Sequence, residues 1–405
     1  MKPTCRICGL DKFDKILDMG DNALVNSLVE AKDLDRKEEV YPLKLIRCSN
    51  CSLVQVEKPI DSHKIYKDVD YLYYSSDMPG LEDYFREYVK ELSDYVTPVD
   101  GIVEIGSNDG IMLKIFQERG NPVLGVDPAT NVAVRAIARG VPTLPLFFDE
   151  RLAKLILAEL GDPKLIYGNN CIAHIDNLEG VMRGVTTLLG PEGLFVVECN
   201  YWGGMVKNTN YALVYHDHFS YFSLKNWVEY APKFGLKVFD AWVTPAQGGS
   251  LRVFMTKDPS REPTERFKAL LAEESKGGST TLKGAKEYGK KCLDEAKKLF
   301  ALVDGLKKEG KTIAGYGAAA KGFSVLKLAG IDENQISYFI DDSPAKQGKY
   351  TPVSHIPVYS RAEVEDKLPD YFFITAPNYE LQIVAKEKAF HDNGGKFVTC
   401  DSRVY

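Results

Sequence analysis

The sequence predicts an α/β protein with three parts: a small zinc-binding N-terminal domain, a central Rossmann-like domain and a C-terminal Rossmann-like domain. Two CxxC pairs lie near the N-terminus, and short apolar runs alternate with amphipathic stretches from about residue 80 to 257 and again after about residue 310. Such alternation is typical of βα units with parallel strands. Because 405 residues exceed what one hydrophobic core usually organises, we expect domains at residues 1–68, 69–258 and 259–405.

The composition is that of an ordinary globular protein, with 44% hydrophobic and 27% charged residues. No run of about 18 apolar residues predicts a membrane span. A net charge of -6 offers no basic footprint for nucleic acid. The first residues lack the apolar stretch and cleavage site of a secretory signal. We therefore expect a cytoplasmic monomer that binds neither membranes nor nucleic acid.

The N-terminal domain has few large apolar residues and two pairs of cysteines. Each CxxC pair places two sulfurs on a tight turn, so two pairs complete a tetrahedral shell around one ion. The 39-residue gap between the pairs is longer than in compact zinc ribbons, which leaves four reduced thiols as the alternative. Four thiolates leave no open coordination position, so the zinc is expected to be structural. The predicted ligands are Cys5, Cys8, Cys48 and Cys51.

The central domain begins its strand series with a glycine loop. Residues 101–105, 122–126, 164–167 and 193–197 are the predicted strands. Residues 106–110 follow the first strand and precede an amphipathic helix, and glycines there let the backbone approach a ligand closely. Asp127 ends the next strand, where a carboxylate can accept hydrogen bonds from ribose hydroxyls.

This first loop lacks the GxGxxG spacing of a diphosphate site and has an acidic flank, which suits a cationic nucleoside without phosphate. S-adenosylmethionine is such a ligand, and a simple turn without a ligand is the alternative. A second group of polar residues follows strand 164–167 at the same edge of the sheet. The predicted cofactor residues are Glu104, Gly106, Asn108, Gly110, Asp127, Asn169, Asn170 and His174.

The C-terminal domain follows a polar linker and a long amphipathic helix whose apolar positions run from Tyr288 to Leu306. Its predicted strands are residues 312–314, 336–340 and 371–375. The glycine loop 315–322 follows the first of these and matches GxGxxA. Taken alone, it predicts NAD and an NAD-dependent sugar-nucleotide oxidoreductase. Lys321, which follows the motif directly, can equally neutralise the diphosphate of a substrate.

Two clusters supply candidates for catalysis. Residues 215–223 contain two of the six histidines, next to a carboxylate and two tyrosines. A histidine near a carboxylate suits a general base, and a phenol can hold a forming oxyanion; a polar turn is the alternative. Residues 70–76 are rich in tyrosine and lie at a domain junction, where substrate clefts often form. A half-buried strand would give the same alternation.

The order of these motifs resembles the sugar C-methyltransferases, which methylate a carbon of nucleotide-linked deoxy-keto-sugars. The likeness covers essentially the whole chain. The motifs that carry it are the double CxxC, YLYYSS at 71–76, EIGSNDG at 104–110, GNNCIAH at 168–174, YHDH at 215–218, GGSLR at 248–252 and GYGAAAKG at 315–322. The chain departs from the family at Asp217 (often glutamate), at Gln247 (often histidine) and at residues 375–378.

The resemblance implies a class I methyltransferase fold for the central domain and a C-terminal domain that encloses the sugar nucleotide without binding NAD. It implies that His218 is the general base and that Tyr215, Asp217 and Tyr71 assist it. The predicted substrate-binding residues are Tyr73, Ser75, Arg252 and Lys321. A non-enzymatic, zinc-stabilised binding module is the remaining alternative, and it does not account for two nucleotide loops in one chain.

Overall fold

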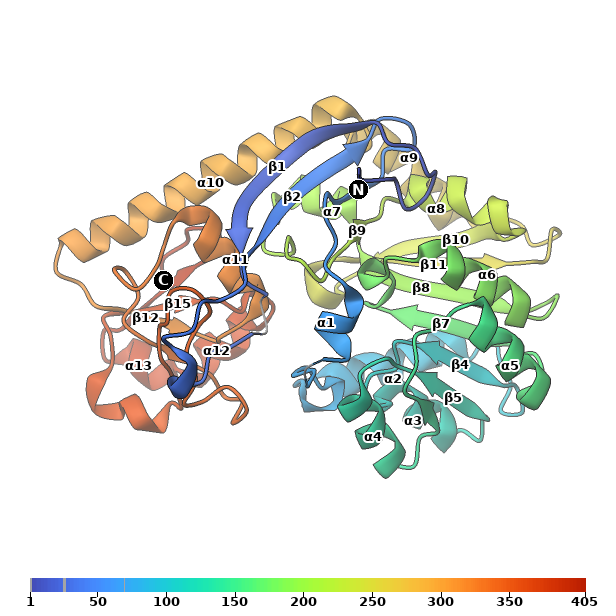
Figure 1. The fold of residues 1–405 in the computed structure, drawn as a ribbon, viewed down its shortest axis with the longest axis horizontal. Helices are drawn as coiled ribbons and strands as arrows, with labels where there is room; N and C mark the ends of the chain where they lie inside the picture. The colour runs from blue at the N-terminus through green and yellow to red at the C-terminus, as the bar shows by residue number, and fades with distance from the viewer. Residues whose placement is uncertain (1, 25–26, 69) are drawn as a thin grey trace.

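The computed structural model describes residues 2–24, 27–68 and 70–405. It contains two lobes that are joined by an N-terminal sheet and a long helix (Figure 1). The green and cyan lobe holds the central part of the chain, and the orange and red lobe holds the C-terminal part. Among the described residues, no helix is long and apolar enough to cross a membrane.

The central lobe contains a seven-stranded sheet in the order β10-β11-β8-β7-β4-β5-β6. The strands from β8 to β6 are parallel, whereas β11 is antiparallel to both of its neighbours. Every residue of β4 and β8 is buried, as expected for strands covered on both faces. The strands are β4 (Ile102–Ile105), β5 (Val123–Val126), β6 (Thr143–Leu144), β7 (Leu165–Asn169), β8 (Leu194–Asn200), β10 (Lys237–Thr244) and β11 (Ser250–Thr256).

Helices cover both faces of this sheet. Apolar residues of α2 and α3 pack on one face, and those of α5, α6 and α8 pack on the other. The helices of the lobe are α2 (Leu81–Leu92), α3 (Ile111–Glu118), α4 (Thr130–Ala138), α5 (Glu150–Leu160), α6 (Leu178–Leu188), α7 (Trp202–Asn208) and α8 (Leu224–Tyr230). All four strands predicted for this region are therefore confirmed.

The C-terminal lobe contains a parallel five-stranded sheet in the order β14-β13-β12-β15-β16. Its three predicted strands are present, but the second is shorter than predicted because the amides of Gln335 and Ile336 bond to the Asp332 carbonyl in a turn. The elements are β12 (Ile313–Tyr316), α11 (Ala320–Ala329), β13 (Phe339–Ile340), β14 (Val358–Tyr359), β15 (Tyr371–Ile374), α12 (Glu380–Lys386), α13 (Lys388–Asp392) and β16 (Lys396–Thr399). The predicted α/β fold class is thereby confirmed.

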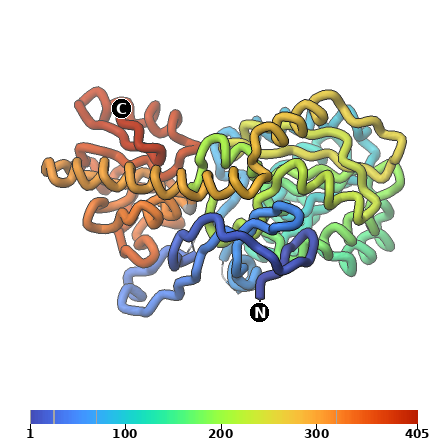
Figure 2. Tube along the Cα trace, turned by 90° about the horizontal axis from the view of Figure 1, so that it is seen from above, coloured from blue at the N-terminus to red at the C-terminus, as the bar shows by residue number. Residues whose placement is uncertain are grey.

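The N-terminal sheet takes its fourth strand from the central part of the chain. Its order is β1-β2-β3-β9, with β1 (Phe13–Asn22), β2 (Tyr41–Cys48), β3 (Val54–Val56) and β9 (Ser220–Tyr221). The helix α10 (Leu282–Lys308) lies along β1, and Figure 2 shows the pair from above. At Gly289 a Cβ atom would lie 2.0 Å from the Ile16 carbonyl oxygen, so only glycine permits this approach.

Two elements thus cross the domain boundaries that we propose. β9 joins the N-terminal sheet, and α9 (Glu265–Gly277) packs against β10 and α8 of the central lobe. The Glu274 carboxylate of α9 accepts hydrogen bonds from the amides of Leu224 and Lys225 at 2.8 and 2.9 Å.

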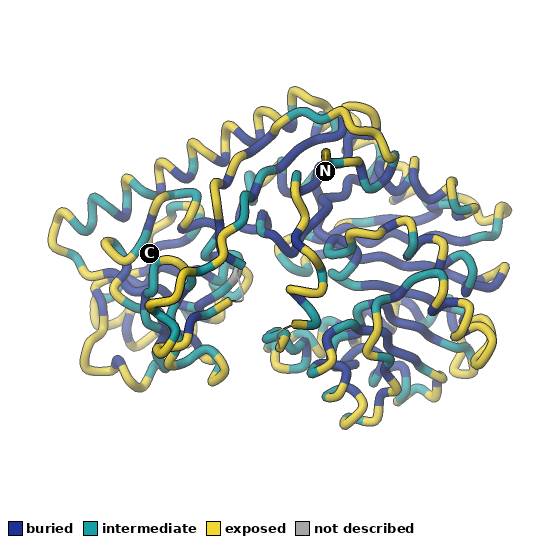
Figure 3. The backbone as a smooth tube through the Cα atoms, in the orientation of Figure 1, coloured by how far each residue is buried: buried dark blue, intermediate teal, exposed yellow. Residues whose placement is uncertain are grey.

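One hydrophobic cluster joins the three parts of the chain. It contains buried residues of β1, β2 and β3, of segment 211–221, of α10 and of the C-terminal sheet. Figure 3 shows this buried backbone in dark blue beneath the outer helices. Segment 211–221, which contains the candidate His218, is therefore enclosed by elements from every part of the chain.

Candidate active site

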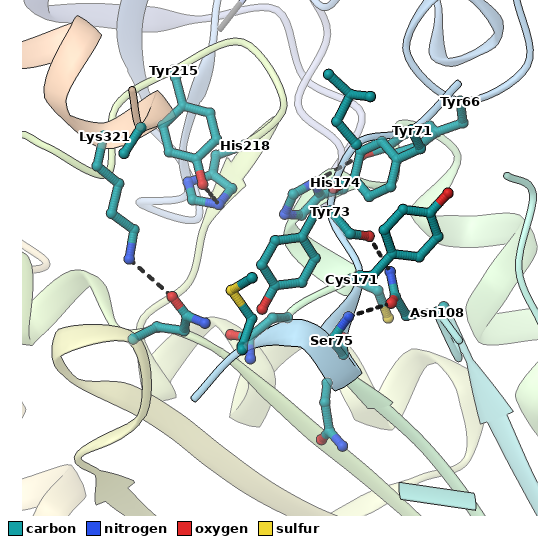
Figure 4. A pocket seen from close by; sticks show the side chains of 18 of the residues that line it. Tyr66, Tyr71, Tyr73, Ser75, Asn108, Cys171, His174, Tyr215, His218 and Lys321 are labelled. Atoms are coloured by element: carbon teal, nitrogen blue, oxygen red, sulfur yellow. Dashed lines mark hydrogen bonds between the residues drawn. The ribbon is translucent and has the colours of Figure 1, made fainter. Parts of the chain in front are cut away.

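A cavity of about 1500 Å³ lies between the two lobes. Its walls include residues at the carboxyl ends of β4, β5, β7 and β8 on one side and those that follow β12 and β13 on the other. The carboxyl edges of both parallel sheets therefore face the same space, which is where ligands bind in open α/β sheets. Figure 4 shows part of this cavity from close by.

The first glycine loop approaches the cavity through a conformation that favours glycine. Gly106 has φ 68°, and a Cβ atom there would lie 2.4 Å from the Cβ of Cys171. Asp127 accepts amide hydrogen bonds from Asn108 and Ala129, both at 2.9 Å. Each carboxylate oxygen of Asp127 accepts one of these bonds and keeps a lone pair for a ligand. Burial raises the pKa of Asp127 to about 6.

A second acceptor near the loop has no partner. The Nδ2 atom of Asn169 lies 3.1 Å from the Met112 sulfur, while its Oδ1 atom is buried without a hydrogen-bond partner among the described residues. Asn169, Asn170 and Asp127 all line the cavity. An unpaired acceptor beside a carboxylate fits a ligand that carries ammonium, hydroxyl and sulfonium groups, as S-adenosylmethionine does.

Two of the predicted cofactor residues do not line the cavity. The Glu104 carboxylate is buried behind the loop, where the Tyr167 hydroxyl donates to it at 3.0 Å and burial raises its pKa well above the usual value. Gly110 precedes α3 with φ 76°, and a Cβ atom there would contact Val141 at 3.0 Å. Both residues shape the loop, and the structure gives neither of them the predicted direct contact.

Asn108 uses its side chain to hold residues 71–77, a segment that we call the strap. Its Oδ1 accepts the Ser75 amide hydrogen bond at 2.7 Å, and its Nδ2 donates to the Tyr73 carbonyl at 3.1 Å (Figure 4). Asn131 holds the other end of the strap through the backbone of Tyr71. The strap is not the strand that its tyrosines allow, and it places Tyr71, Tyr73 and Ser75 on the cavity wall.

His218 is held in one tautomer. Its Nδ1 lies 2.7 Å from the Leu213 carbonyl, which can only accept a hydrogen bond, so Nδ1 bears the proton. Nε2 therefore has a lone pair, and the Tyr215 hydroxyl donates to it at 2.9 Å (Figure 4). Burial, with repulsion from His174, lowers the pKa of His218 well below its usual value. The imidazole is neutral at physiological pH and able to accept a proton.

The carboxylate of Asp217 does not orient this imidazole, contrary to our expectation. No hydrogen bond joins Asp217 to His218 in the described part of the chain, and Asp217 is outside the cavity wall. The Leu213 carbonyl takes that position instead, and a backbone carbonyl has no sequence signature. Burial raises the pKa of Asp217 to about 7.

His174, which we predicted at the cofactor, lies beside His218 on the cavity wall. The two ring centroids are 4.8 Å apart, and the Nδ1 of His174 lies 2.8 Å from the Tyr66 hydroxyl. Tyr66 also packs against Tyr71 with a centroid separation of 5.3 Å. Sequence reasoning missed Tyr66, because α1 (Ser62–Tyr66) matches no catalytic motif.

Lys321 brings an isolated positive charge into the cavity from the C-terminal lobe. Its Nζ donates to the Gln247 side-chain oxygen at 2.9 Å, and Asn378 donates to the same oxygen at 3.1 Å. No carboxylate pairs with Lys321 among the described residues. Burial lowers the pKa of Lys321 to about 8. A cation with only a neutral acceptor beside it is suited to an anionic ligand.

The acidic residue that would hold the ribose of NAD is paired with a lysine. Asp341 accepts from the Ala318 amide at 2.7 Å and from the Lys346 ammonium at 3.1 Å, and its other oxygen accepts from the Ser343 amide. Asp341 thus differs from Asp127 in having a lysine at one of its oxygens, and the NAD alternative gains no support.

Arg252 does not bind in the cavity, and its predicted role was wrong. Its guanidinium pairs with Glu198 at 2.8 Å and with Glu91, and it lies 3.2 Å from the ring centroid of Tyr88. Its side chain is only 2% exposed. The side chain of Arg252 thus lies between Glu198 of β8 and Glu91 of α2, and these two carboxylates neutralise its buried charge. Arg252 is therefore part of the packing between β11 and α2.

The four predicted metal ligands are brought together. The Sγ atoms of Cys5, Cys8, Cys48 and Cys51 all lie within 4.8 Å of one another. Four sulfurs at about 2.3 Å from one zinc ion lie about 3.8 Å apart, so this set fits a tetrahedral zinc site. A closed shell of four thiolates gives the metal a structural role.

Family comparisons match three consecutive segments of the chain. Residues 5–66 match a zinc binding domain found in methyltransferases, residues 78–241 match a methyltransferase domain, and residues 245–400 match a C-methyltransferase C-terminal domain.

Whole-chain and structural comparisons add individual relatives. The C-methyltransferase NovU of Streptomyces niveus is 34% identical over 397 residues, which cover 97% of this chain and 94% of the relative. The CcbJ methyltransferase of Streptomyces caelestis is 16% identical with a TM-score of 0.36, covering 45% of this chain and 94% of that one. The magnesium protoporphyrin IX methyltransferase of Synechocystis PCC 6803, solved with bound SAH, is 13% identical with a TM-score of 0.36, covering 49% and 93%.

Proposed function

The chain belongs to the C-methyltransferases that combine a zinc-binding domain with an S-adenosylmethionine-dependent methyltransferase domain, and from this membership we propose that it methylates a carbon next to a ketone. We further propose that the ketone belongs to a nucleotide-linked deoxy-sugar. The carrying observation is the tautomer of His218, whose Nε2 lone pair faces the same cavity as the S-adenosylmethionine loop.

Methylation at carbon requires that a proton leave that carbon. A neighbouring ketone makes the proton removable, because the resulting enolate places its charge on oxygen. The Nε2 of His218 takes this proton, while Nδ1 continues to donate to the Leu213 carbonyl. Proton removal by His218 therefore does not require a carboxylate at Nδ1, because the Leu213 carbonyl holds that atom.

The tyrosine hydroxyls supply the hydrogen bonds for the enolate oxygen. Burial raises the pKa of both Tyr215 and Tyr71 well above the usual value, so both phenols keep their protons and act as donors. Tyr215 donates to His218 in this structure, and a bound ketone offers it another acceptor. The side-chain amide of Asn200, which lies 3.1 Å from Nε2, must also turn away before the Nε2 lone pair takes the carbon-bound proton.

The methyl donor would be held by the Gly106 loop, Asp127 and Asn169. When bound, S-adenosylmethionine supplies an electrophilic methyl group on its sulfonium. Asp127 would accept from the ribose hydroxyls, and the strap would cover the loop through Asn108. The strap and the loop exclude water from the reacting atoms.

The size and charge of the cavity support a second, anionic ligand. Pockets for one drug-sized ligand have about 300–1,000 Å³, whereas this cavity has about 1500 Å³. The buried ammonium of Lys321 lies on the C-terminal wall. We propose that it neutralises the diphosphate of the sugar nucleotide.

Proton exchange in heavy water separates the two halves of this proposal. Nucleotide keto-sugars are incubated with the enzyme in D₂O, with and without S-adenosylmethionine, and followed by NMR and mass spectrometry. We expect exchange next to the ketone without the methyl donor and gain of one methyl group with it. Methylation at oxygen or nitrogen, or no reaction across a panel that also includes keto acids, would contradict the proposal.

A further inference from the structure

Arg6 lies between the two cysteines of the first CxxC pair, yet its guanidinium reaches both loops that carry the active-site histidines. Its Nε donates to the Asp176 carboxylate at 2.9 Å, and its Nη1 donates to the Phe219 carbonyl at 3.1 Å. Phe219 directly follows His218, and Asp176 is two residues beyond His174. The Arg6 side chain is only 6% exposed, whereas the Asp176 side chain is 55% exposed, so the bond to Phe219 is the more buried of the two.

The second CxxC pair reaches the same place through the backbone. β3 begins three residues after Cys51 and pairs with β9, the strand that follows His218. The amide of Val56 donates at 3.0 Å to the Phe219 carbonyl, the same oxygen that accepts from Arg6. Gln55 of β3 also contacts the first CxxC turn. Its side chain accepts a hydrogen bond from the Arg6 amide at 3.2 Å and donates one to the Thr4 carbonyl at 3.0 Å.

We propose that Arg6 is a positioning residue that couples zinc binding to the placement of His218 and His174. Four thiolates around one ion fix the backbone of residues 5–8. The position of the Arg6 Cα atom, from which the guanidinium extends, is fixed with it. Without the ion, the thiolate bonds that join this turn to the second CxxC pair are lost, and the hydrogen bonds of Gln55 remain. The metal therefore acts on the reaction without contacting a substrate, an inference that rests on the proposed role of His218.

The test is an Arg6→Met variant of the full-length, zinc-loaded enzyme. Methionine keeps an apolar stem against the Phe219 ring, over which the Arg6 guanidinium lies at 5.5 Å, but removes both donated bonds. We expect unchanged zinc content by elemental analysis, unchanged affinity for S-adenosylmethionine and a kcat about 10- to 100-fold lower. Arg6→Lys keeps one donor and should recover part of this loss.

Hydrogen–deuterium exchange gives a readout that needs no acceptor substrate. We expect faster exchange in residues 172–177 and 213–222 of Arg6→Met. The matched control is Lys233→Met, because Lys233 donates at 3.1 Å to the Ile7 carbonyl in the same turn while its ammonium lies over the Tyr230 ring, away from the histidine loops. This control should leave exchange in both loops unchanged.

Zinc removal completes the test. Chelation should speed exchange of residues 213–222 in the wild-type protein and add less in Arg6→Met, where only the backbone connection through β3 and β9 remains. Wild-type exchange in zinc-loaded Arg6→Met, or an equal effect of chelation in both proteins, overturns the coupling. Hydrogen–deuterium exchange is measured without any keto-sugar. The test of Arg6 therefore stays valid even if the protein does not methylate the proposed substrate.

Discussion

Replacement of Asp217 by asparagine should stabilise the protein, and the effect should grow with pH. Asp217 is 3% exposed, and burial raises its pKa from 3.8 to about 7. Because this folded-state pKa lies above the unfolded-state value, the folded protein favours the protonated acid. The stability that the wild-type carboxyl contributes is present at low pH and is lost as the pH rises from about 4 to 7.

The magnitude follows from the two pKa values. Each unit of difference corresponds to about 1.4 kcal/mol, so the ionised carboxylate costs at most about 4 kcal/mol of folding free energy at pH 8. At pH 5 the cost is about 1.5 kcal/mol, because the folded acid is still protonated. Asparagine is similar in size and does not titrate, so the stability difference between Asp217→Asn and wild type should widen by about 2–3 kcal/mol between these pH values.

Urea denaturation of the zinc-loaded proteins at pH 5 and pH 8 measures this difference, with the fluorescence of the three tryptophans as the signal. Asp11→Asn, at an exposed aspartate, is the matched control and should show no pH-dependent difference. A variant less stable than wild type at pH 8, or a difference independent of pH, would refute the reasoning. Since Nδ1 of His218 donates to the Leu213 carbonyl, turnover should fall by less than about tenfold.

Three further predictions concern the cavity. His218→Asn should lower the rates of α-proton exchange and methylation by at least about 100-fold, while calorimetry should still detect binding of S-adenosylmethionine. Wild-type turnover would contradict the assignment of His218 as the general base. Below pH 6 the affinity for S-adenosylmethionine should fall about tenfold per pH unit, because protonation of Asp127 removes the ribose acceptor. Asp127→Asn should bind S-adenosylmethionine weakly and without this pH dependence. A wild-type affinity that stays level between pH 7 and 5 would exclude Asp127 as the ribose acceptor. Lys321→Met should raise the KM for the sugar nucleotide about 10- to 100-fold. Isothermal titration should show an unchanged affinity for S-adenosylmethionine. An unaltered KM would contradict the proposed contact between Lys321 and the diphosphate.

The sequence predicted the parallel strands and the metal ligands because their patterns are local. β4 and β8 consist of apolar residues apart from one carboxylate in each and Asn200 at the end of β8. Each CxxC pair places its own two sulfurs on a turn. The glycine loop and Asp127 were also located, since residues after neighbouring parallel strands meet at one edge of the sheet.

The errors concern features that sequence patterns do not encode. Arg252 lies in a strand buried on both faces, so no alternation of polar and apolar residues shows which way its side chain points. The partner of His218 is the Leu213 carbonyl, which every residue type supplies. β9 has only two residues and pairs with a strand about 165 positions earlier, so long-range pairing and not local propensity decides its structure.

The cluster shared by β1, segment 211–221, α10 and the C-terminal sheet has a consequence for cooperativity. Each part of the chain supplies only some of the apolar surfaces in this core, so removal of one part exposes the faces that it covered to water. A chain truncated at residue 258 would lose α10 and uncover β1 and Tyr211 to Val214, which belong to the same segment as His218. Segment 211–221, which contains His218, therefore keeps its buried surroundings only while β1, α10 and the C-terminal sheet remain packed together.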